Sequence, residues 1–164
     1  ELIKFNFAED YIRVKIENNQ ILFKIDDFLF FSMLSEEKFP RVERIIPSQF
    51  KTLVQISRTD LLNALQRVII ISENNNFISK LEIKDNGLIL KANSNIGSIE
   101  EELEIKREGL YLDIYLNTRF LIEPLRVIES DQIILNFLES NGPCVISSLE
   151  ETESFLYLIL PIKS

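Results

Sequence analysis

The sequence predicts an α+β fold in which one β-α-β-β-β unit occurs twice between residues 51 and 164. The order of a strand, a helix and three strands repeats, and the two helices align at a spacing of 60 residues. In both helices, apolar residues recur at the spacing of one helical face. The matched pairs are Leu61 with Leu121, Leu62 with Ile122, Leu65 with Leu125, and Val68 with Ile128.

The first copy is built around a helix that begins near Ser57 or Thr59 and runs to about Ile71. Either hydroxyl can cap this helix, and Asp60 in the first turn suits the positive end of the helix dipole. Asp85-Asn86-Gly87 joins the second and third strands of this copy and is a strong hairpin signal. The expected strands cover residues 53–56, 77–84, 88–93 and 99–106.

The second copy contains a helix that Asn117 caps and that is expected to run to about Glu129. Pro124 lies inside this helix, where it removes a backbone hydrogen bond and predicts a bend. Apolar and polar residues alternate with period two along the strand that precedes the helix. The expected strands cover residues 110–116, 132–138, 144–149 and 155–162.

Residues 11–34 predict a meander of three strands without a helix of its own. Apolar and charged residues alternate along 12–17, and Asn18-Asn19 supplies a turn. Three strands alone leave an apolar face without a second layer, so this segment is interpreted as the end of a larger domain. The predicted organisation is part of one domain with a linker at 1–50, followed by a complete domain at 51–164.

The composition limits the classes of function. The 164 residues carry a net charge of -8, no histidine and one cysteine, Cys144. A single cysteine excludes an intrachain disulfide and favours a reducing, cytoplasmic setting. No run approaches the roughly 20 apolar residues of a membrane-spanning helix, so no membrane association is expected. Because the chain is acidic, binding to DNA requires its positive charge to be gathered on one surface.

Candidate catalytic groups are sparse in this sequence. Without histidine, the usual acid–base residue at neutral pH is missing, and the four glycines form no phosphate-binding loop. Cys144 is either a nucleophile or a half-buried strand residue, and the second interpretation is favoured because the sequence places no base beside it. The carboxylates at 100–102 point to alternating faces of a strand and do not converge on one metal ion. We therefore expect no enzyme activity, no metal and no cofactor.

Several segments, taken in order, resemble the bacterial beta sliding clamps, the beta subunits of DNA polymerase III. They cover nearly the whole chain and correspond to the end of the second domain and all of the third domain of that family. The segments are Phe28-Leu29-Phe30-Phe31-Ser32, Phe39-Pro40, Arg44-Ile45-Ile46-Pro47, Leu62 through Ser72, Asn117 through Leu121, and Tyr157 through Lys163.

The resemblance implies a non-catalytic processivity factor, in which two subunits form a homodimeric ring around double-stranded DNA. It implies that DNA polymerase III, clamp-loader subunits, other polymerases and repair proteins dock linear motifs in a pocket between the second and third domains. An apolar cleft with a few polar groups suits such anchoring. The implied pocket residues are Pro40, Arg44, Ile45, Asn117, Phe120, Cys144, Leu158, Ile159, Leu160, Pro161 and Ile162.

The same resemblance implies two further surfaces. A ring-closing interface and a DNA-facing helical surface are expected, although a residual core, a solvated strand face and ordinary surface arginines also fit these residues. The interface residues are Ile70, Ile71, Glu100, Glu102 and Glu104, and the DNA-facing residues are Arg58, Arg67, Arg119 and Arg126. A second interpretation of the whole chain is a duplicated α+β interaction module that binds peptides and not DNA.

Overall fold

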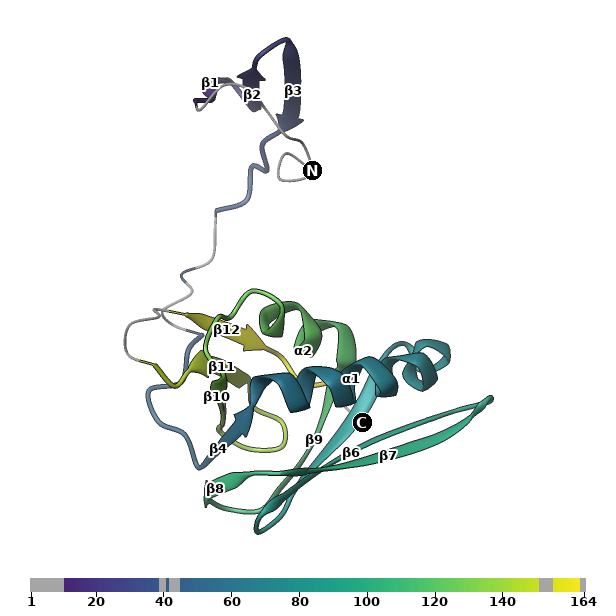
Figure 1. Cartoon of the computed structure of the whole chain (residues 1–164). Helices are drawn as coiled ribbons and strands as arrows, with labels where there is room; N and C mark the ends of the chain where they lie inside the picture. Colours follow the sequence, from purple (N-terminus) through teal and green to yellow (C-terminus); the bar gives the residue numbers. More distant parts are fainter. Residues whose placement is uncertain (1–10, 39–40, 42–44, 151–154, 163–164) are drawn as a thin grey trace. The chain divides into compact units, whose positions relative to one another are not determined.

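The computed structural model describes residues 11–38, 41, 45–150 and 155–162 (Figure 1). The chain divides into two compact units, Glu1–Arg41 and Val42–Ser164. The first unit contains an antiparallel sheet in the order β1-β2-β3. Its strands are β1 (Arg13–Glu17), β2 (Gln20–Ile25) and β3 (Phe28–Met33). The predicted meander is confirmed, and Asn18 and Asp26 adopt positive φ angles of 51° and 49° at its two turns.

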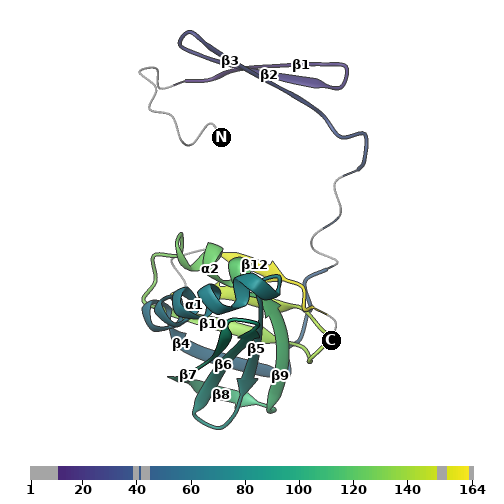
Figure 2. The same ribbon diagram turned by 90° about the vertical axis from the view of Figure 1, so that its right-hand side faces the viewer.

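The second unit packs helices α1 and α2 against two antiparallel sheets, ordered β12-β11-β10-β4-β8 and β7-β6-β5-β9. The helices lie side by side in both views (Figures 1 and 2). Within the described residues, neither helix is long and apolar enough to cross a membrane. The elements are β4 (Thr52–Ser57), α1 (Arg58–Ser72), the 3-10 helix η3 (Glu73–Asn75), β5 (Ile78–Ile83), β6 (Gly87–Ser94), β7 (Gly97–Glu104), β8 (Lys106–Gly109), β9 (Leu112–Asn117), α2 (Thr118–Leu125), β10 (Gln132–Phe137), β11 (Cys144–Ser148) and β12 (Leu156–Ile159).

The two halves of this unit exchange strands. Strand β4 of the first half pairs with β10 of the second, and β9 of the second half pairs with β5 of the first. The backbone N–H that opens each helix also crosses to the other half. Arg58 N–H donates to the Asp131 carbonyl at 3.0 Å, and Thr118 N–H donates to the Phe77 carbonyl at 2.7 Å. The two helices are therefore equivalent, and the predicted duplication is confirmed.

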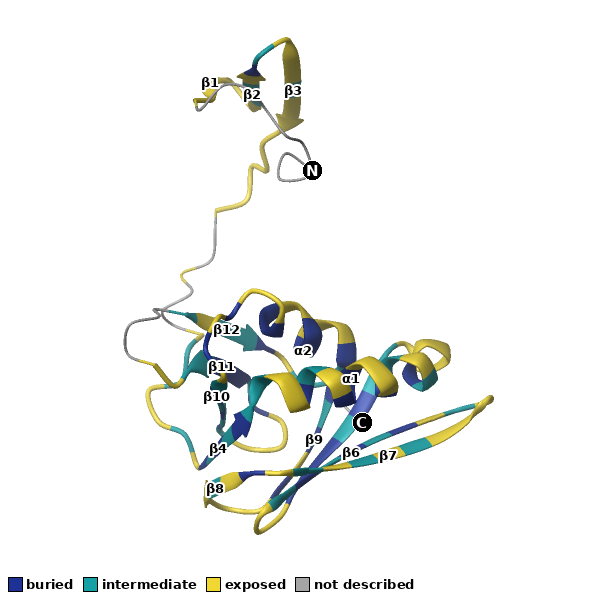
Figure 3. Cartoon of the chain, viewed as in Figure 1, coloured by how far each residue is buried: buried dark blue, intermediate teal, exposed yellow. Residues whose placement is uncertain are grey.

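Apolar faces of both helices close one continuous core over the two sheets, as the dark blue segments of Figure 3 show. The pairs matched across the duplication all belong to this core or pack against it. Fully or nearly fully buried members are Leu61, Leu65, Val68, Leu121, Ile122, Leu125 and Ile128, and Leu62 is partly buried. Burial of one Leu or Ile side chain stabilises a fold by about 1.5–3 kcal/mol, so this seam contributes heavily to stability.

The structure corrects several expected boundaries, and the last strand, expected at 155–162, covers only Leu156–Ile159. Helix α2 ends at Leu125 instead of Glu129, and the turn tightens directly after Pro124. The N–H groups of Val127 and Ile128 then donate to the Pro124 carbonyl at 3.1 and 3.0 Å. The strand expected at 99–106 is also divided, since β7 ends at Glu104 and β8 joins the other sheet beside β4.

Gly109 ends β8 at the point where the chain turns toward β9. Its φ angle of +95° lies in the left-handed region, and its Cα approaches the backbone of Lys51. Two hydrogen bonds join the same two segments beside Gly109. Leu110 N–H donates to the Lys51 carbonyl at 3.2 Å, and the Thr52 hydroxyl donates to the Leu110 carbonyl at 2.9 Å. This position therefore combines a left-handed backbone with a close backbone approach, and both require glycine.

Candidate binding surfaces

An apolar cleft of about 380 Å³ lies beside the last strand. Leu156 and Leu158 of β12 line one side, and Ile45 and Ile46 of the preceding connection complete it. Leu156 and Leu158 share a strand face because they are two residues apart. Tyr157 points the other way, and its hydroxyl donates to Glu123 on α2 at 3.0 Å. The cleft therefore lies on the face of β12 opposite to the contact between Tyr157 and α2.

The structure brings together part of the predicted pocket. Ile45 and Leu158 line the cleft, and Leu160 is 64% exposed two residues further along the chain. Asn117 and Phe120 lie at the start of α2 and are not among the residues that line this cleft. Pro161 and Ile162 are half-buried. Two predicted members, Pro40 and Arg44, lie outside the described residues.

Cys144 and Ile159 do not line the cleft. They face each other across the β11–β12 pair, and only 0% and 2% of their surfaces are exposed. Both belong to the hydrophobic core, since alternate residues of these strands point inward. Burial raises the pKa of the Cys144 thiol above its ordinary value, which disfavours the thiolate that nucleophilic attack requires.

Sequence reasoning missed Ile46 and Leu156 as cleft residues. The period-two alternation of residues 156–160 was sufficient to place Leu156 with Leu158 and Leu160 and to separate Ile159 from them. The predicted pocket included every residue of 158–162 and so did not separate the two faces of the strand. Ile46 had no comparable pattern, because it belongs to an irregular connection.

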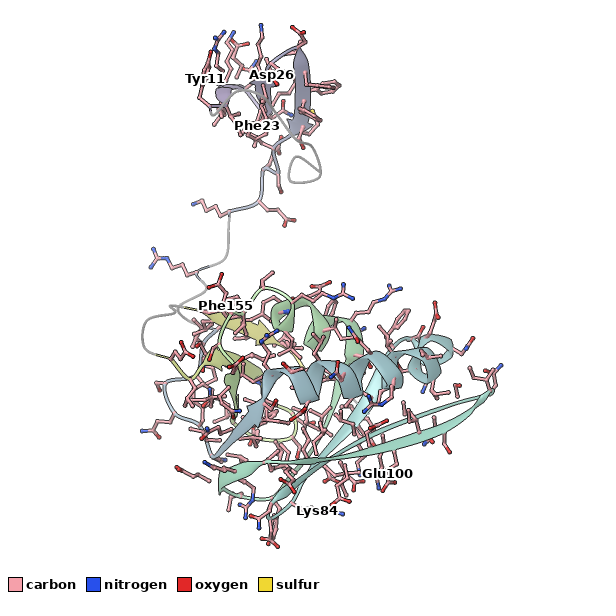
Figure 4. All side chains as sticks on the ribbon, in the orientation of Figure 1. Tyr11, Phe23, Asp26, Lys84, Glu100 and Phe155 are labelled. Atoms are coloured by element: carbon pink, nitrogen blue, oxygen red, sulfur yellow. The ribbon has the colours of Figure 1, made fainter. Side chains whose placement is uncertain are left out.

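The predicted interface residues lie near one edge of the second sheet. Strand β7 is an edge strand, and its residues Glu100, Glu102 and Glu104 are exposed on one face. Figure 4 shows Glu100 on the side of this sheet that faces away from the helices. Ile70 near the end of α1 is 62% exposed, whereas Ile71 is half-buried and packs on the core. An exposed isoleucine and a free strand edge are both suited to protein contact.

Two of the four predicted DNA-facing arginines are engaged within the protein. Arg67 binds Glu101 through two hydrogen bonds of 2.6 and 2.7 Å, which hold the pKa of the Glu101 carboxyl below its usual value. Arg58 donates to the carbonyls of Leu125 and Ser130 at 3.1 and 3.0 Å. Arg58 therefore satisfies a carbonyl at the end of α2 and joins the two helices.

Arg119 and Arg126 differ from that pair. Arg119 of α2 and Arg126, the residue that follows this helix, are exposed and line a groove of about 430 Å³ between the two helices. In the described part of the chain, neither arginine forms an ion pair with a carboxylate. The groove residues are Gln66, Ile69, Arg119, Ile122, Glu123 and Arg126. The groove mixes polar and apolar residues, and its two arginines outnumber the single carboxylate of Glu123, which suits an anionic ligand.

A cluster of lysines surrounds Glu82 on the outer face of the β7-β6-β5-β9 sheet. Glu82 is only 8% exposed, and its carboxylate pairs with Lys80 at 2.8 Å, Lys91 at 3.2 Å and Lys84 at 3.3 Å. The hydrogen bond from Lys80, followed by that from Lys91, lowers the pKa of Glu82 to about 2. Figure 4 shows Lys84 on the same side of the sheet as Glu100, away from the helices.

Replacing Glu82 by glutamine is expected to lower the free energy of unfolding by about 2 kcal/mol at pH 7. Because the folded pKa is depressed, the stabilisation is fully present above the unfolded pKa and is lost as pH falls toward 2. Urea denaturation of the wild type and of Glu82→Gln at several pH values measures this. The difference between their free energies of unfolding should shrink below about pH 4.5. The control, Glu104→Gln, removes an exposed carboxylate without an ion pair among the described residues and should change little. A Glu82→Gln deficit that stays constant down to pH 2 would contradict this assignment.

Metal-binding clusters of His, Cys, Asp or Glu are not found among the described residues. The described residues present three candidate contact surfaces: the apolar cleft, the β7 edge with Ile70, and the groove between the helices.

Solved structures of DNA polymerase III beta subunits share the fold of this chain. The DNA polymerase III beta subunit of Thermotoga maritima superimposes with a TM-score of 0.77 at 32% identity, over 96% of this chain and 43% of that chain. The beta chain of Streptococcus pneumoniae gives a TM-score of 0.78 at 28% identity, over 93% of this chain and 41% of that chain. The fold is therefore that of the DNA sliding clamps.

Sequence comparison identifies the family. The model of the DNA polymerase III beta subunit, C-terminal domain, matches residues 43–163. The beta sliding clamp of Streptococcus pneumoniae is 29% identical over 163 residues, which are 96% of this chain and 43% of that protein. That of Staphylococcus aureus is 28% identical over 159 residues, which are 95% of this chain and 42% of that protein. The chain belongs to the DNA polymerase III beta subunit family and spans less than half the length of these curated relatives.

Proposed function

We propose that this chain forms the C-terminal part of a non-catalytic sliding clamp, which encircles duplex DNA and tethers polymerases and other clients. The observation that carries the proposal is the duplicated fold with its two equivalent helices side by side, in a chain that belongs to the beta subunit family. Ring closure would bring such helices around the DNA. Replication takes place in the bacterial cytoplasm, so the protein would act there.

The groove between the helices is the proposed DNA-facing surface. Arg119 and Arg126 would make the phosphate contacts, since no carboxylate of the described residues pairs with either. Arg58 and Arg67 would support the same surface from within, because their donors are used by the protein. Contacts to phosphate carry no sequence information, which suits a ring that slides.

The apolar cleft is the proposed client site. Its lining of Ile45, Ile46, Leu156 and Leu158 matches Leu or Phe side chains of a linear motif. Two such anchors at about 1.5–3 kcal/mol each are enough to dominate a micromolar contact. Leu160, Pro161 and Ile162 would extend this wall, and Asn117 and Phe120 would add a neighbouring contact on α2.

The β7 edge is the proposed ring-closing surface. An unpaired strand edge can extend a sheet across two subunits, and Ile70 can enter an apolar pocket of the partner. Glu100, Glu102 and Glu104 would pair with basic residues on the facing subunit and favour the correct orientation. Ile71, which is half-buried, would support Ile70 from below.

The full-length protein, loaded on circular DNA by its clamp loader, is expected to stay bound and to dissociate when one cut linearises the circle. A topologically linked ring leaves linear DNA through the ends, whereas a protein held by direct contacts does not. Gel filtration of loaded DNA before and after cutting measures the difference. The control carries bulky protein blocks on both ends of the linear DNA and should retain the ring. Equal retention on circular and open linear DNA, or no retention at all, would favour the peptide-binding module without a DNA role.

A further inference from the structure

The connection between α1 and β5 holds two successive residues in a left-handed conformation. Asn76 has a φ angle of 52° and Phe77 a φ angle of 59°. Asparagine visits this region readily, but a bulky aromatic residue there is a genuine outlier. Such strain persists only where the surroundings determine the conformation, and it occurs frequently at functional sites.

Hydrogen bonds fix the strained connection from both sides. Phe77 N–H donates to the Ser72 carbonyl at 2.8 Å, at the end of α1. The Phe77 carbonyl accepts from the N–H and the hydroxyl of Thr118, at 2.7 and 2.9 Å. The buried Ser72 and Thr118 hydroxyls lie 3.2 Å apart and bond to each other. The ring of Phe77 is therefore held at a set position beside the start of α2.

That position lies directly beneath an arginine. The guanidinium carbon of Arg119 is 3.6 Å from the centroid of the Phe77 ring. Stacking covers one face of the guanidinium and leaves its N–H groups available at the perimeter. Arg119 is exposed, it lines the groove between the helices with Arg126, and it has no carboxylate partner among the described residues. The arginine is thus oriented and still able to donate.

We propose that Phe77 is a positioning residue for Arg119, holding its guanidinium ready to donate to a backbone phosphate of duplex DNA. This inference rests on the proposed clamp function and specifies how one contact of that surface is prepared. A free arginine side chain loses rotamer freedom when it binds, and a stacked one has already lost much of it. The backbone strain at Phe77 therefore supports an arginine that is ordered before DNA arrives.

The test measures binding of the full-length protein to a fluorescent duplex over a series of salt concentrations. Phe77→Leu should weaken binding about two- to fivefold at low salt, which corresponds to loss of an exposed cation–π contact. Arg119→Gln should reduce the slope of log affinity against log salt by about 1. The double variant should bind no more weakly than Arg119→Gln alone, because Phe77 acts through Arg119.

Two further variants separate positioning from folding. Phe77→Tyr keeps the aromatic face and should bind DNA as the wild type does. Phe77→Gly suits the left-handed backbone but removes the ring, so it should fold and yet bind as weakly as Phe77→Leu. Wild-type affinity in both ringless variants, no effect of Arg119→Gln, or additive losses in the double variant would overturn the inference. Wild-type protein that binds no DNA would instead overturn the proposed function itself.

Discussion

Replacing Gly109 by alanine is expected to lower the free energy of unfolding by about 3 kcal/mol or more. A Cβ atom added there would overlap the carbonyl oxygen of Lys51 and lie 3.1 Å from the Cα atom of Thr52. The φ angle of +95° also excludes an L side chain without strain. Relief requires β4 and β8 to separate, and β4 is paired with β10 on its other side. One methyl group therefore disturbs the pairing of the edge strand β8 with β4 and strains a strand that the rest of the sheet is built on.

Urea denaturation followed by circular dichroism measures this loss. Gly87→Ala is the matched control, because a Cβ atom there meets only the flexible Glu102 carboxylate at 3.4 Å. This control is expected to stay within about 1 kcal/mol of the wild type. A Gly109→Ala chain as stable as Gly87→Ala would show that the approach of Gly109 to Lys51 does not constrain the fold.

Leu158→Glu is expected to weaken binding of a peptide with adjacent Leu and Phe anchors at least about tenfold. The substitution removes an apolar wall of the cleft and places a charge against the incoming side chains. Loss of one anchor alone is worth about 1.5–3 kcal/mol, and 1.4 kcal/mol is tenfold in affinity. Fluorescence anisotropy of a labelled peptide with the full-length protein measures the change.

Ile96→Glu is the control for this substitution. Ile96 is also an exposed apolar residue, but it lies in the turn between β6 and β7 and does not line the cleft. Ile96→Glu changes the net charge by the same amount as Leu158→Glu and should leave peptide affinity unchanged. Equal affinity in Leu158→Glu and the wild type would remove the cleft from the proposed client site.

The duplication was predictable because apolar residues recur at regular spacings along its helices and strands. Leu61 and Leu121 hold equivalent positions on amphipathic helices, and both are fully buried in the structure. The alternating strands and the hairpin turn before Gly87 were predictable for the same reason. Patterns of this kind are determined by local geometry, so one sequence suffices to detect them.

The end of α2 and the roles of the arginines were harder to predict from the sequence. Pro124 predicts a disturbed helix, but whether the helix bends or ends depends on what packs beyond it. Arg67 and Arg119 both read as basic residues of helices. Only the fold places Glu101 beside the first and Phe77 beneath the second, since each partner comes from a distant segment. Long-range pairing is set by tertiary structure and leaves no periodic trace.

The strand exchange between the halves has a consequence for how this domain forms. Neither copy of the repeated unit can complete its own sheet, because β4 and β9 each belong to the sheet built mainly by the other copy. The earliest half to emerge from a ribosome would have an open sheet edge until the second half is synthesised. Folding is therefore expected to be all-or-none and dominated by distant contacts, so an ancestral duplication now behaves as one indivisible unit.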